Sequence, residues 1–260
     1  MKTGIVVLLW CSCVTAACEC YSQDSSTHRT VFPSGIAAQG AYGYLATRDD
    51  HVSEEKYSGS VWGFGLHWSR FHETYGFRIG LTYEQASHVT NYNVSAEVTQ
   101  GAFTLINLYP AGKEELFGND LFTYIGPSAE AFVYYRKQNI AQNPEASPDI
   151  YQSGAWLFSL GARGEMTLLF GEGFQLESAL QASLLSLGGG TGNESNNSTP
   201  IALLTPFAAL RGSFEIGLRY YLLESVSLAA GYRLEVTRIS SWNYILTSSD
   251  NAYLSLEWHL

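Results

Sequence analysis

Apolar and polar residues alternate with a period of two along most of this 260-residue chain. From Trp156 to Phe170 the even positions are apolar or glycine, whereas the odd positions include Ser159, Arg163 and Glu165. Successive side chains of a β-strand point to opposite faces of a sheet, so this pattern predicts strands with one apolar and one polar face. The same alternation recurs in further stretches, at 75–84, 208–220 and 226–237.

The alternation and the turn residues between its runs predict ten strands. Their expected ranges are 36–47, 60–71, 74–87, 92–108, 120–137, 152–170, 173–187, 203–221, 225–239 and 251–260. In the fourth range the alternation changes phase near Gly101 and Ala102, which indicates a β-bulge there. Pro206 interrupts the start of the eighth range. Beyond the first residues no apolar run is long enough for a transmembrane helix, so an all-β fold is expected.

Short and long connections alternate between the predicted strands. The short ones are His72-Glu73, Gly171–Gly173 and Leu223-Glu224, with a moderate one at 110–119. The longer, polar ones are 48–59, 88–91, 138–151, 188–202 and 240–250. Such an alternation, with both chain ends on the short-turn side, is typical of closed antiparallel up-and-down transmembrane β-barrels. Ten is the expected number of strands, with eight or twelve as alternatives.

The charge distribution indicates which face of such a barrel points outward. The apolar faces of the clearest strands carry no charge over their central spans, and large aromatics gather toward the strand ends, as in two interfacial girdles. The polar faces hold arginine and glutamate, and the whole chain has only four lysines. A soluble barrel would place the apolar set inside. We therefore predict the inverted arrangement, in which a one-residue slip of the eighth strand would turn Arg211 toward lipid at a cost of roughly 2–4 kcal/mol.

With the polar set inward, fourteen charged side chains are predicted to enter the lumen. They are Arg78, Glu84, Glu97, Glu130, Arg136, Arg163, Glu165, Glu177, Arg211, Glu215, Arg219, Arg233, Glu235 and Glu257. A barrel of about eight strands is just filled by its own side chains, so these charges are expected to interlock as a plug. A narrow ion-lined channel is the alternative. Four aromatic side chains are expected to fill the lumen further, namely Phe122, Tyr124, Phe132 and Tyr134.

The last strand runs to the end of the chain with Leu254, Leu256, Trp258 and Leu260 on one face. It resembles the C-terminal targeting strand of outer-membrane barrels, which usually ends in phenylalanine, where this chain has leucine. Residues 35–260 thus resemble the broad family of small bacterial outer-membrane β-barrel proteins. The resemblance implies a bacterial outer-membrane location with lipid around the barrel. It also implies periplasmic chaperones and the barrel assembly machinery as partners.

The first residues indicate export. Lys2 is followed by an apolar run and by small residues at 15–17, which predicts a signal peptide over 1–17 and a periplasmic segment over 18–34. All four cysteines lie at 11–20, so no disulfide framework is expected, and Cys18 is a candidate for lipidation. The formal net charge of −10 argues against nucleic acid as a partner.

Two enzyme families of the outer membrane share a few residue types with this chain. His67 and Ser69 resemble the His-x-Ser pair of outer-membrane lipid A deacylases, but Glu73 is a poor stand-in for the third member because it lies in the following turn. The omptin proteases need acidic and histidine side chains at the extracellular rim. The nearest candidates are Asp49-Asp50-His51, with His88. Filling of the lumen and solvated loop charges explain these residues more simply. No catalytic residue, metal site or cofactor is expected.

The expected role is that of a non-enzymatic outer-membrane barrel, which contributes to envelope integrity or to surface contacts through its loops. The loop at 188–202 is rich in Gly, Asn and Ser, and the loop at 240–250 carries Trp242 and Tyr244. These two loops are the candidates for a surface ligand, although the second could instead cap the barrel mouth. A narrow pore or transporter for small solutes is the alternative function, ahead of a lipid A deacylase or an omptin-like protease.

Overall fold

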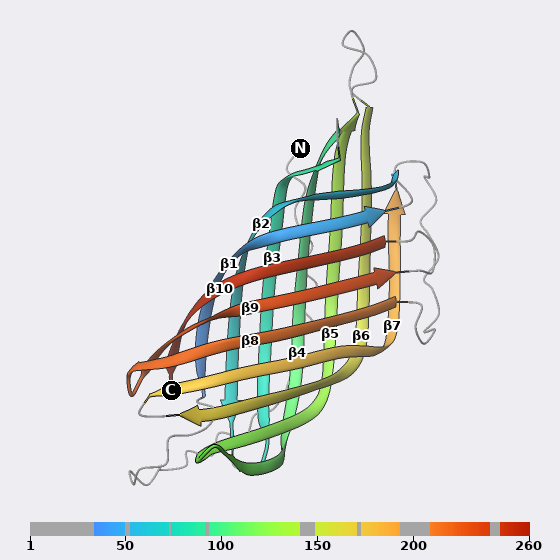
Figure 1. Cartoon of the computed structure of the whole chain (residues 1–260). Helices are drawn as coiled ribbons and strands as arrows, with labels where there is room; N and C mark the ends of the chain where they lie inside the picture. The colour runs from blue at the N-terminus through green and yellow to red at the C-terminus, as the bar shows by residue number, and fades with distance from the viewer. Residues whose placement is uncertain are drawn as a thin grey trace. The chain divides into compact units, whose positions relative to one another are not determined.

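A computed structural model describes residues 34–49, 53–72, 74–91, 94–140, 149–170, 173–192, 209–239 and 245–260. They form the strands β1 Gly35–Asp49, β2 Ser53–Phe71, β3 Gly76–Asn91, β4 Val94–Leu116, β5 Asn119–Ile140, β6 Asp149–Phe170, β7 Phe174–Gly192, β8 Ala209–Leu223, β9 Val226–Ile239 and β10 Ile245–His259. Each strand pairs antiparallel with its neighbours in sequence, and β1 pairs with β10, which closes the barrel (Figure 1). The predicted all-β fold, the antiparallel order and the number of strands are confirmed.

The predicted signal peptide (1–17) and all but the last residue of the predicted periplasmic segment (18–34) lie outside the described residues. They stay predictions. Among the residues that the structure describes, no helix has the length and apolarity needed to cross a membrane.

The two ends of the barrel differ in the connections that they carry. Gly35 at the start of β1 faces His259 at the end of β10. The β2–β3, β4–β5, β6–β7 and β8–β9 connections lie at this same end, because the strands run alternately up and down. We call it the turn end. The opposite end, which receives the connections predicted to be long, is the loop end.

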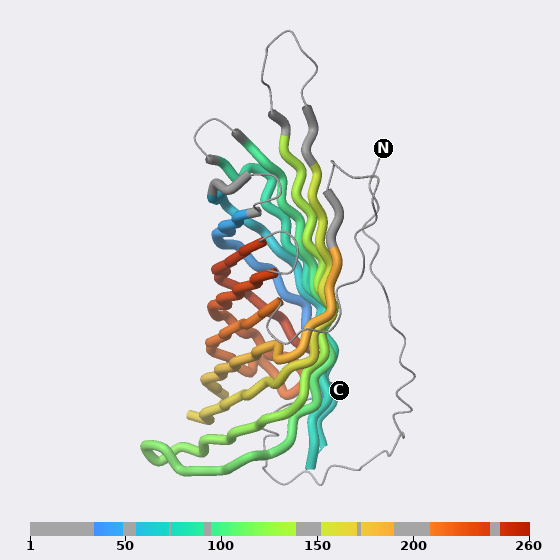
Figure 2. The backbone as a smooth tube through the Cα atoms, turned by 90° about the vertical axis from the view of Figure 1, so that its right-hand side faces the viewer, coloured from blue at the N-terminus to red at the C-terminus, as the bar shows by residue number. Residues whose placement is uncertain are grey.

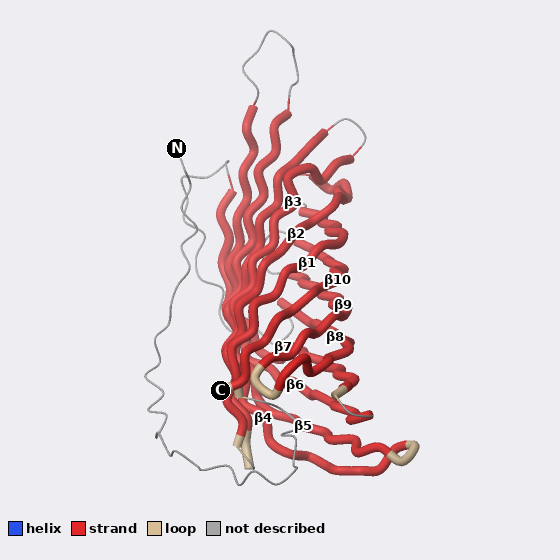
Figure 3. The backbone as a smooth tube through the Cα atoms, turned by 90° about the vertical axis from the view of Figure 1, so that its left-hand side faces the viewer, coloured by secondary structure: helices blue, strands red, loops and turns tan. Residues whose placement is uncertain are grey.

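The β4–β5 connection differs from its prediction. Residues 110–119 were expected to be a loop, but β4 continues to Leu116 and β5 begins at Asn119. The turn has positive φ at Phe117 (53°) and Gly118 (76°), the combination that a tight two-residue hairpin turn of type I′ requires. The loop prediction was wrong because Pro110 and Gly112 suggested a strand end, whereas the structure absorbs them in a register shift. The resulting hairpin reaches beyond the neighbouring strands (Figures 2 and 3).

The predicted bulge near Gly101 and Ala102 is wrong. In β4 the even positions from Ala96 to Ile106 are buried or half-buried without interruption, so the strand keeps one phase. The shift of register lies instead in the neighbouring β3, between Ala86 and Val89. The sequence misled because β4 carries apolar residues on both faces at this level.

The bounds of the two predicted long loops in the C-terminal half, 188–202 and 240–250, differ from the prediction. β7 continues through 188–192, and β10 begins at Ile245, whereas 193–208 and 240–244 lie outside the described residues. The glycines of β7 that suggested a loop have a packing role. A Cβ on Gly189 would come within 2.5 Å of Nε1 of Trp156, on the strand alongside, so only glycine leaves room for this ring.

The predicted orientation of the two faces is confirmed on β6. Trp156, Phe158 and Leu160 are 40%, 42% and 45% exposed on the outer surface, whereas Arg163 and Glu165 are 7% and 4% exposed in the interior. Apolar side chains with this exposure recur on the outward positions of all ten strands. An exposed apolar surface around a whole barrel has no counterpart in a soluble monomer, and it suits the hydrocarbon of a bilayer.

Candidate functional site in the barrel lumen

The polar faces of the strands meet in the lumen, and most of the predicted charged residues lie there. Eight of them form one continuous network of ion pairs between the turn end and the middle of the barrel. Its members alternate in charge along the series Arg78, Glu165, Arg163, Glu215, Arg233, Glu235, Arg211 and Glu130. Four guanidinium groups thus meet four carboxylates, and the network is neutral as a whole.

Geometry favours strong pairing at the centre of this network. Arg163 donates from Nε to Glu165 at 2.6 Å and from Nη2 to Glu215 at 3.0 Å. Arg233 donates from Nε to the other carboxylate oxygen of Glu215 at 2.5 Å. Each carboxylate is therefore shared by two guanidinium groups, since Glu165 also accepts from Arg78 at 2.6 Å. Charge-assisted bonds of this kind are stronger than neutral ones.

The network crosses the lumen as well as following its wall. Arg78 on β3 reaches Glu165 on β6, and Arg211 on β8 reaches Glu130 on β5 at 2.8 Å. In both cases two strands stand between the partners in the barrel order. Side chains that meet across the barrel in this way occupy its interior, and they link strands that share no backbone hydrogen bonds.

The remaining predicted charges form smaller groups. Arg219 donates two bonds to Glu177, at 2.6 and 3.2 Å, and also pairs with Glu257 near the turn end. Glu84 accepts from two amides, those of Gln100 at 2.5 Å and of Asn251 at 2.6 Å.

Two of the predicted lumen charges stand apart from these groups. Arg136 is fully buried in the lumen, but it donates a hydrogen bond to Gln138 Oε1 rather than to a carboxylate. Glu97 lies on the outer face, which corrects its predicted place in the lumen. It alternates with buried Ala96 and Val98, and its side chain is exposed near the loop end. The error follows from the phase change wrongly predicted for β4.

A cavity of about 130 Å³ remains within the charged region. Its lining includes Arg78, Arg163, Arg211, Glu215 and His67. This volume has room for roughly ten water molecules. Such water would solvate the carboxylate and guanidinium atoms that the ion pairs leave open.

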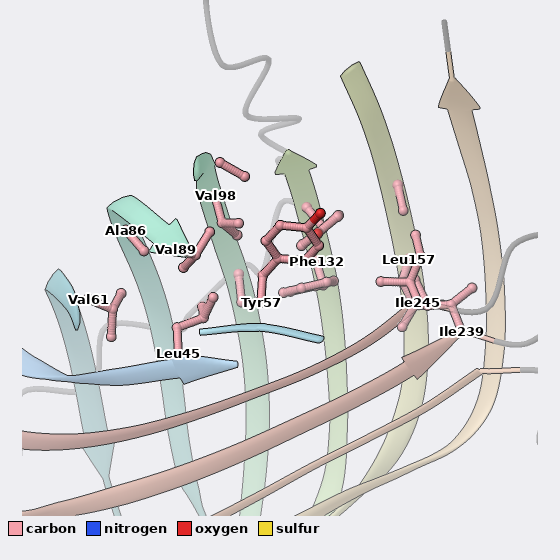
Figure 4. Packing of buried hydrophobic residues seen from close by; sticks show 14 of the residues in the cluster. Leu45, Tyr57, Val61, Ala86, Val89, Val98, Phe132, Leu157, Ile239 and Ile245 are labelled. Carbon is pink, nitrogen blue, oxygen red and sulfur yellow. The ribbon is translucent and has the colours of Figure 1, made fainter. Parts of the chain in front are cut away.

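Nearer the loop end the lumen holds an apolar cluster, with buried polar side chains such as Thr47, Arg136 and Gln138 among it. Fifteen buried residues form a cluster there, and Figure 4 shows side chains of most of them on the inner side of the strands. The cluster consists of Leu45, Tyr57, Val61, Ala86, Val89, Ala96, Val98, Ala102, Phe132, Tyr134, Ala155, Leu157, Ala209, Ile239 and Ile245. Its Tyr134 hydroxyl lies 3.0 Å from Thr47 Oγ1, which joins β5 to β1 across the lumen. We call these residues the apolar cluster.

The ion-pair network and the apolar cluster meet at Arg211. The guanidinium carbon of Arg211 lies 4.3 Å from the centre of the Phe132 ring. This arginine of the network therefore stacks on a ring of the apolar cluster. Phe132 and Tyr134 are buried in the lumen as predicted. Phe122 and Tyr124 are only half-buried, and Phe122 lies against Lys113 of the protruding hairpin.

Sequence reasoning missed most of the apolar cluster and the uncharged polar partners. Gln39 accepts from Arg233 at 3.0 Å, and Thr237 accepts from Arg211 at 2.8 Å. Both residues lie on inward positions of their strands, as the charged residues do, so the alternation could have identified them. Leu157 had no such signal, because Trp156 and Phe158 on either side are also large and apolar.

The enzyme candidates are not brought together as a catalytic group in the described residues. His67 Nε2 lies 3.0 Å from Gln39 Oε1, and Ser69 is buried two positions along the same strand. His88 is exposed near the loop end, whereas Glu73, Asp50, His51 and the side chain of Asp49 lie outside the described residues. Within the described ranges no three His, Cys, Asp or Glu side chains are grouped as metal ligands would be.

The predicted targeting strand is the last strand of the barrel, β10. Leu254, Trp258 and Leu260 are exposed on its outer face, and Leu256 is half-exposed. Their role as a recognition signal stays a prediction.

No protein-family model matches this chain, and no curated protein matches it in sequence. Solved structures match in fold. The outer-membrane protease OmpT from Escherichia coli aligns with a TM-score of 0.50 and 8% identity, over 91% of this chain and 100% of OmpT. The translocator domain of the autotransporter NalP from Neisseria meningitidis aligns with a TM-score of 0.47 and 12% identity, over 90% of each chain.

These similarities extend to the fold alone. Residence in the membrane follows from the chain's own surface, since its apolar face points outward and its charges pair inside. In hydrocarbon a spanning sheet must close to satisfy its edges, and β1 pairs with β10 through fifteen residues of each strand. The chain is therefore a closed membrane-spanning β-barrel, with the fold that solved outer-membrane proteins of bacteria have.

Proposed function

We propose that this protein is a non-enzymatic barrel whose lumen is closed by its own side chains, and that it serves envelope integrity or surface contact. The observation that carries the proposal is the neutral ion-pair network across the lumen. Arg78–Glu165 and Arg211–Glu130 each connect strands separated by two others. A conducting pore needs an open path, whereas these pairs occupy the interior.

The apolar cluster supports the same proposal. Leu157 is 1% exposed and Tyr134 is 2% exposed, so the loop-end interior leaves these side chains almost no contact with solvent. Ions lose most of their hydration in an apolar constriction, which makes such a region a barrier to current. The barrel would then support the envelope or present its loops for contact, rather than transport solutes.

Conductance in planar bilayers tests this proposal. The refolded protein should insert without a steady current, and steady single-channel openings from the unmodified protein would refute a plugged lumen. The double variant Phe132→Ala/Tyr134→Ala should conduct, because it removes two large side chains from the apolar cluster. The outward variant Phe158→Ala is the matched control and should stay closed.

A narrow pore for small solutes is the second candidate, and the cavity of about 130 Å³ is the observation that favours it. The cavity would be a segment of a path that opens when the network rearranges. Uptake of a small solute into vesicles that contain the barrel, without a steady current, would favour this function over the first.

Contact with a surface ligand would involve the loop end. The segments proposed for it are 188–202 and 240–250, whose strand portions belong to β7 and β10. Peptide and lipid A substrates test for an enzyme, and turnover that disappears in His67→Ala would contradict a non-enzymatic role.

A further inference from the structure

The outward side chains of β10 change from apolar to polar at one point. Toward the turn end they are Ala252, Leu254, Leu256 and Trp258, and toward the loop end they are Asp250 and Ser248. Tyrosines flank this point on the two strands beside β10 (Figure 1), because Tyr42 on β1 and Tyr232 on β9 both pair with Ala252. Tyrosine rings are typical of the border between hydrocarbon and lipid headgroups, so Asp250 lies at the headgroup level.

Ala252 leaves a gap between two exposed rings. Tyr42 and Tyr232 are 65% and 43% exposed, and only the methyl side chain of Ala252 stands between them. Neighbouring strands lie about 4.8 Å apart, so the two tyrosines start from backbones roughly 10 Å from each other. This separation has room for an ammonium group between aromatic faces, which attract cations.

Asp250 places a negative charge at the loop-end side of this gap. It precedes Ala252 by two positions on the same face of β10. The Tyr232 side chain interacts with the Asp250 carboxylate through its hydroxyl. Among the described residues no lysine or arginine forms an ion pair with Asp250. A carboxylate beside the apolar surface of a membrane barrel is costly, and a cation nearby reduces this cost.

Glu97 is a second outward acid near the loop end, and its neighbours differ. Lys137 on β5 stands directly opposite Glu97 on β4, so the chain itself places a basic residue beside this carboxylate. The partners of Asp250 in the register are instead Tyr44 and Leu234. The chain thus supplies aromatic and apolar side chains at Asp250, but not the cation.

We propose that Asp250, Tyr42 and Tyr232 bind the ammonium headgroup of a membrane lipid. The ammonium would lie beside the carboxylate and against the tyrosine rings. The acyl chains would follow the apolar outward side of β10, past Ala252 and Leu254 toward the turn end. The lipid would come from the leaflet that surrounds the loop end. The site lies on the outer surface, so it does not depend on whether the lumen is closed.

Native mass spectrometry of the refolded barrel tests this site, because it resolves individual bound lipids. The barrel in detergent micelles is titrated with phosphatidylethanolamine, which carries an ammonium group, or with phosphatidylglycerol of the same acyl chains, which carries none. The first phosphatidylethanolamine should bind about five-fold more tightly than phosphatidylglycerol. Asp250→Asn should remove this preference. Glu97→Gln is the matched control and should retain it.

A second variant separates the gap from the charge. Ala252→Phe keeps the carboxylate but fills the space between the two rings, so it should lower the affinity for phosphatidylethanolamine to that for phosphatidylglycerol. The outward position of Ala252 leaves the interior of the barrel unchanged, and heat-modifiable gel migration checks that each variant folds.

Three results would overturn the proposal. The unmodified barrel could bind the two lipids equally, or Asp250→Asn could retain the preference. A loss of preference in Glu97→Gln as large as in Asp250→Asn would show a general effect of net charge rather than a site. Retention in Ala252→Phe would contradict binding between the rings.

Discussion

The turn-end and loop-end regions of the lumen fill the same kind of space with different chemistry. In the first, four arginines and four glutamates pair in one neutral network, and a cavity of about 130 Å³ remains. In the second, fifteen apolar or aromatic residues form a buried cluster, and its Tyr57 packs against the buried guanidinium of Arg136. Both regions connect strands that are not neighbours in the barrel, through Arg78–Glu165 in one and Tyr134–Thr47 in the other.

The difference indicates what each region contributes. Charged side chains need several partners at fixed geometry, so the network determines which strands face one another and leaves gaps that water can fill. Apolar side chains need only close packing, so the cluster excludes water and ions. Stability against loss of one side chain should therefore depend strongly on the network, whereas closure to ions should depend on the cluster.

The largest expected effect is in the network. Arg211→Met leaves Glu130 without its arginine and removes one of the two partners of Glu235. Because a buried carboxylate without its partner is costly, the free energy of unfolding should fall by about 3–5 kcal/mol, as measured by urea titration in lipid vesicles. Lys113→Met removes an exposed pair with Asp120 and should cost about 1 kcal/mol or less. Equal losses in the two variants would contradict the network's role.

A smaller loss is expected in the apolar cluster. Leu157→Ala should lower the free energy of unfolding by about 3 kcal/mol, since it leaves a void in a packed interior. Leu160→Ala on the same strand is the matched control, because Leu160 is 45% exposed on the outer face whereas Leu157 is 1% exposed. Lipid can fill the space at Leu160, so a loss at this position as large as at Leu157 would argue against a packed loop-end lumen.

The smallest effect should come from a single bond across the lumen. Tyr134→Phe keeps the ring in the cluster but removes the hydroxyl that lies 3.0 Å from Thr47 Oγ1. A loss of about 1 kcal/mol is expected, with the same urea titration as the measurement. Tyr135→Phe, which changes the adjacent outward residue, should alter stability by about 0.5 kcal/mol or less. If both changes are neutral, the bond does not hold the two walls together.

Much of the fold could be predicted because the alternation of side chains is a local property. On β6 the run from Trp156 to Phe170 required only that one face differ from the other, and the structure has that strand at Asp149–Phe170. Prediction failed at Glu97, because apolar Ala96 and Val98 on either side of it point into the lumen, where the charged set was expected, and Glu97 points outward. It also failed at the turn of the β4–β5 hairpin, where Phe117 takes the positive-φ position that Asn, Asp or Gly usually fills before Gly118.

The sequence by itself determined the strands, their antiparallel order and the outward direction of the apolar faces, because a charge facing lipid costs more than any local preference supplies. Only the tertiary structure decided which charges meet. Arg78 and Glu165 are 87 residues apart, and no local rule relates them. The closure of the barrel brings such positions to the same level of the lumen. For the same reason Arg136 shared the inward pattern of the other arginines, and only its neighbours in space distinguish it.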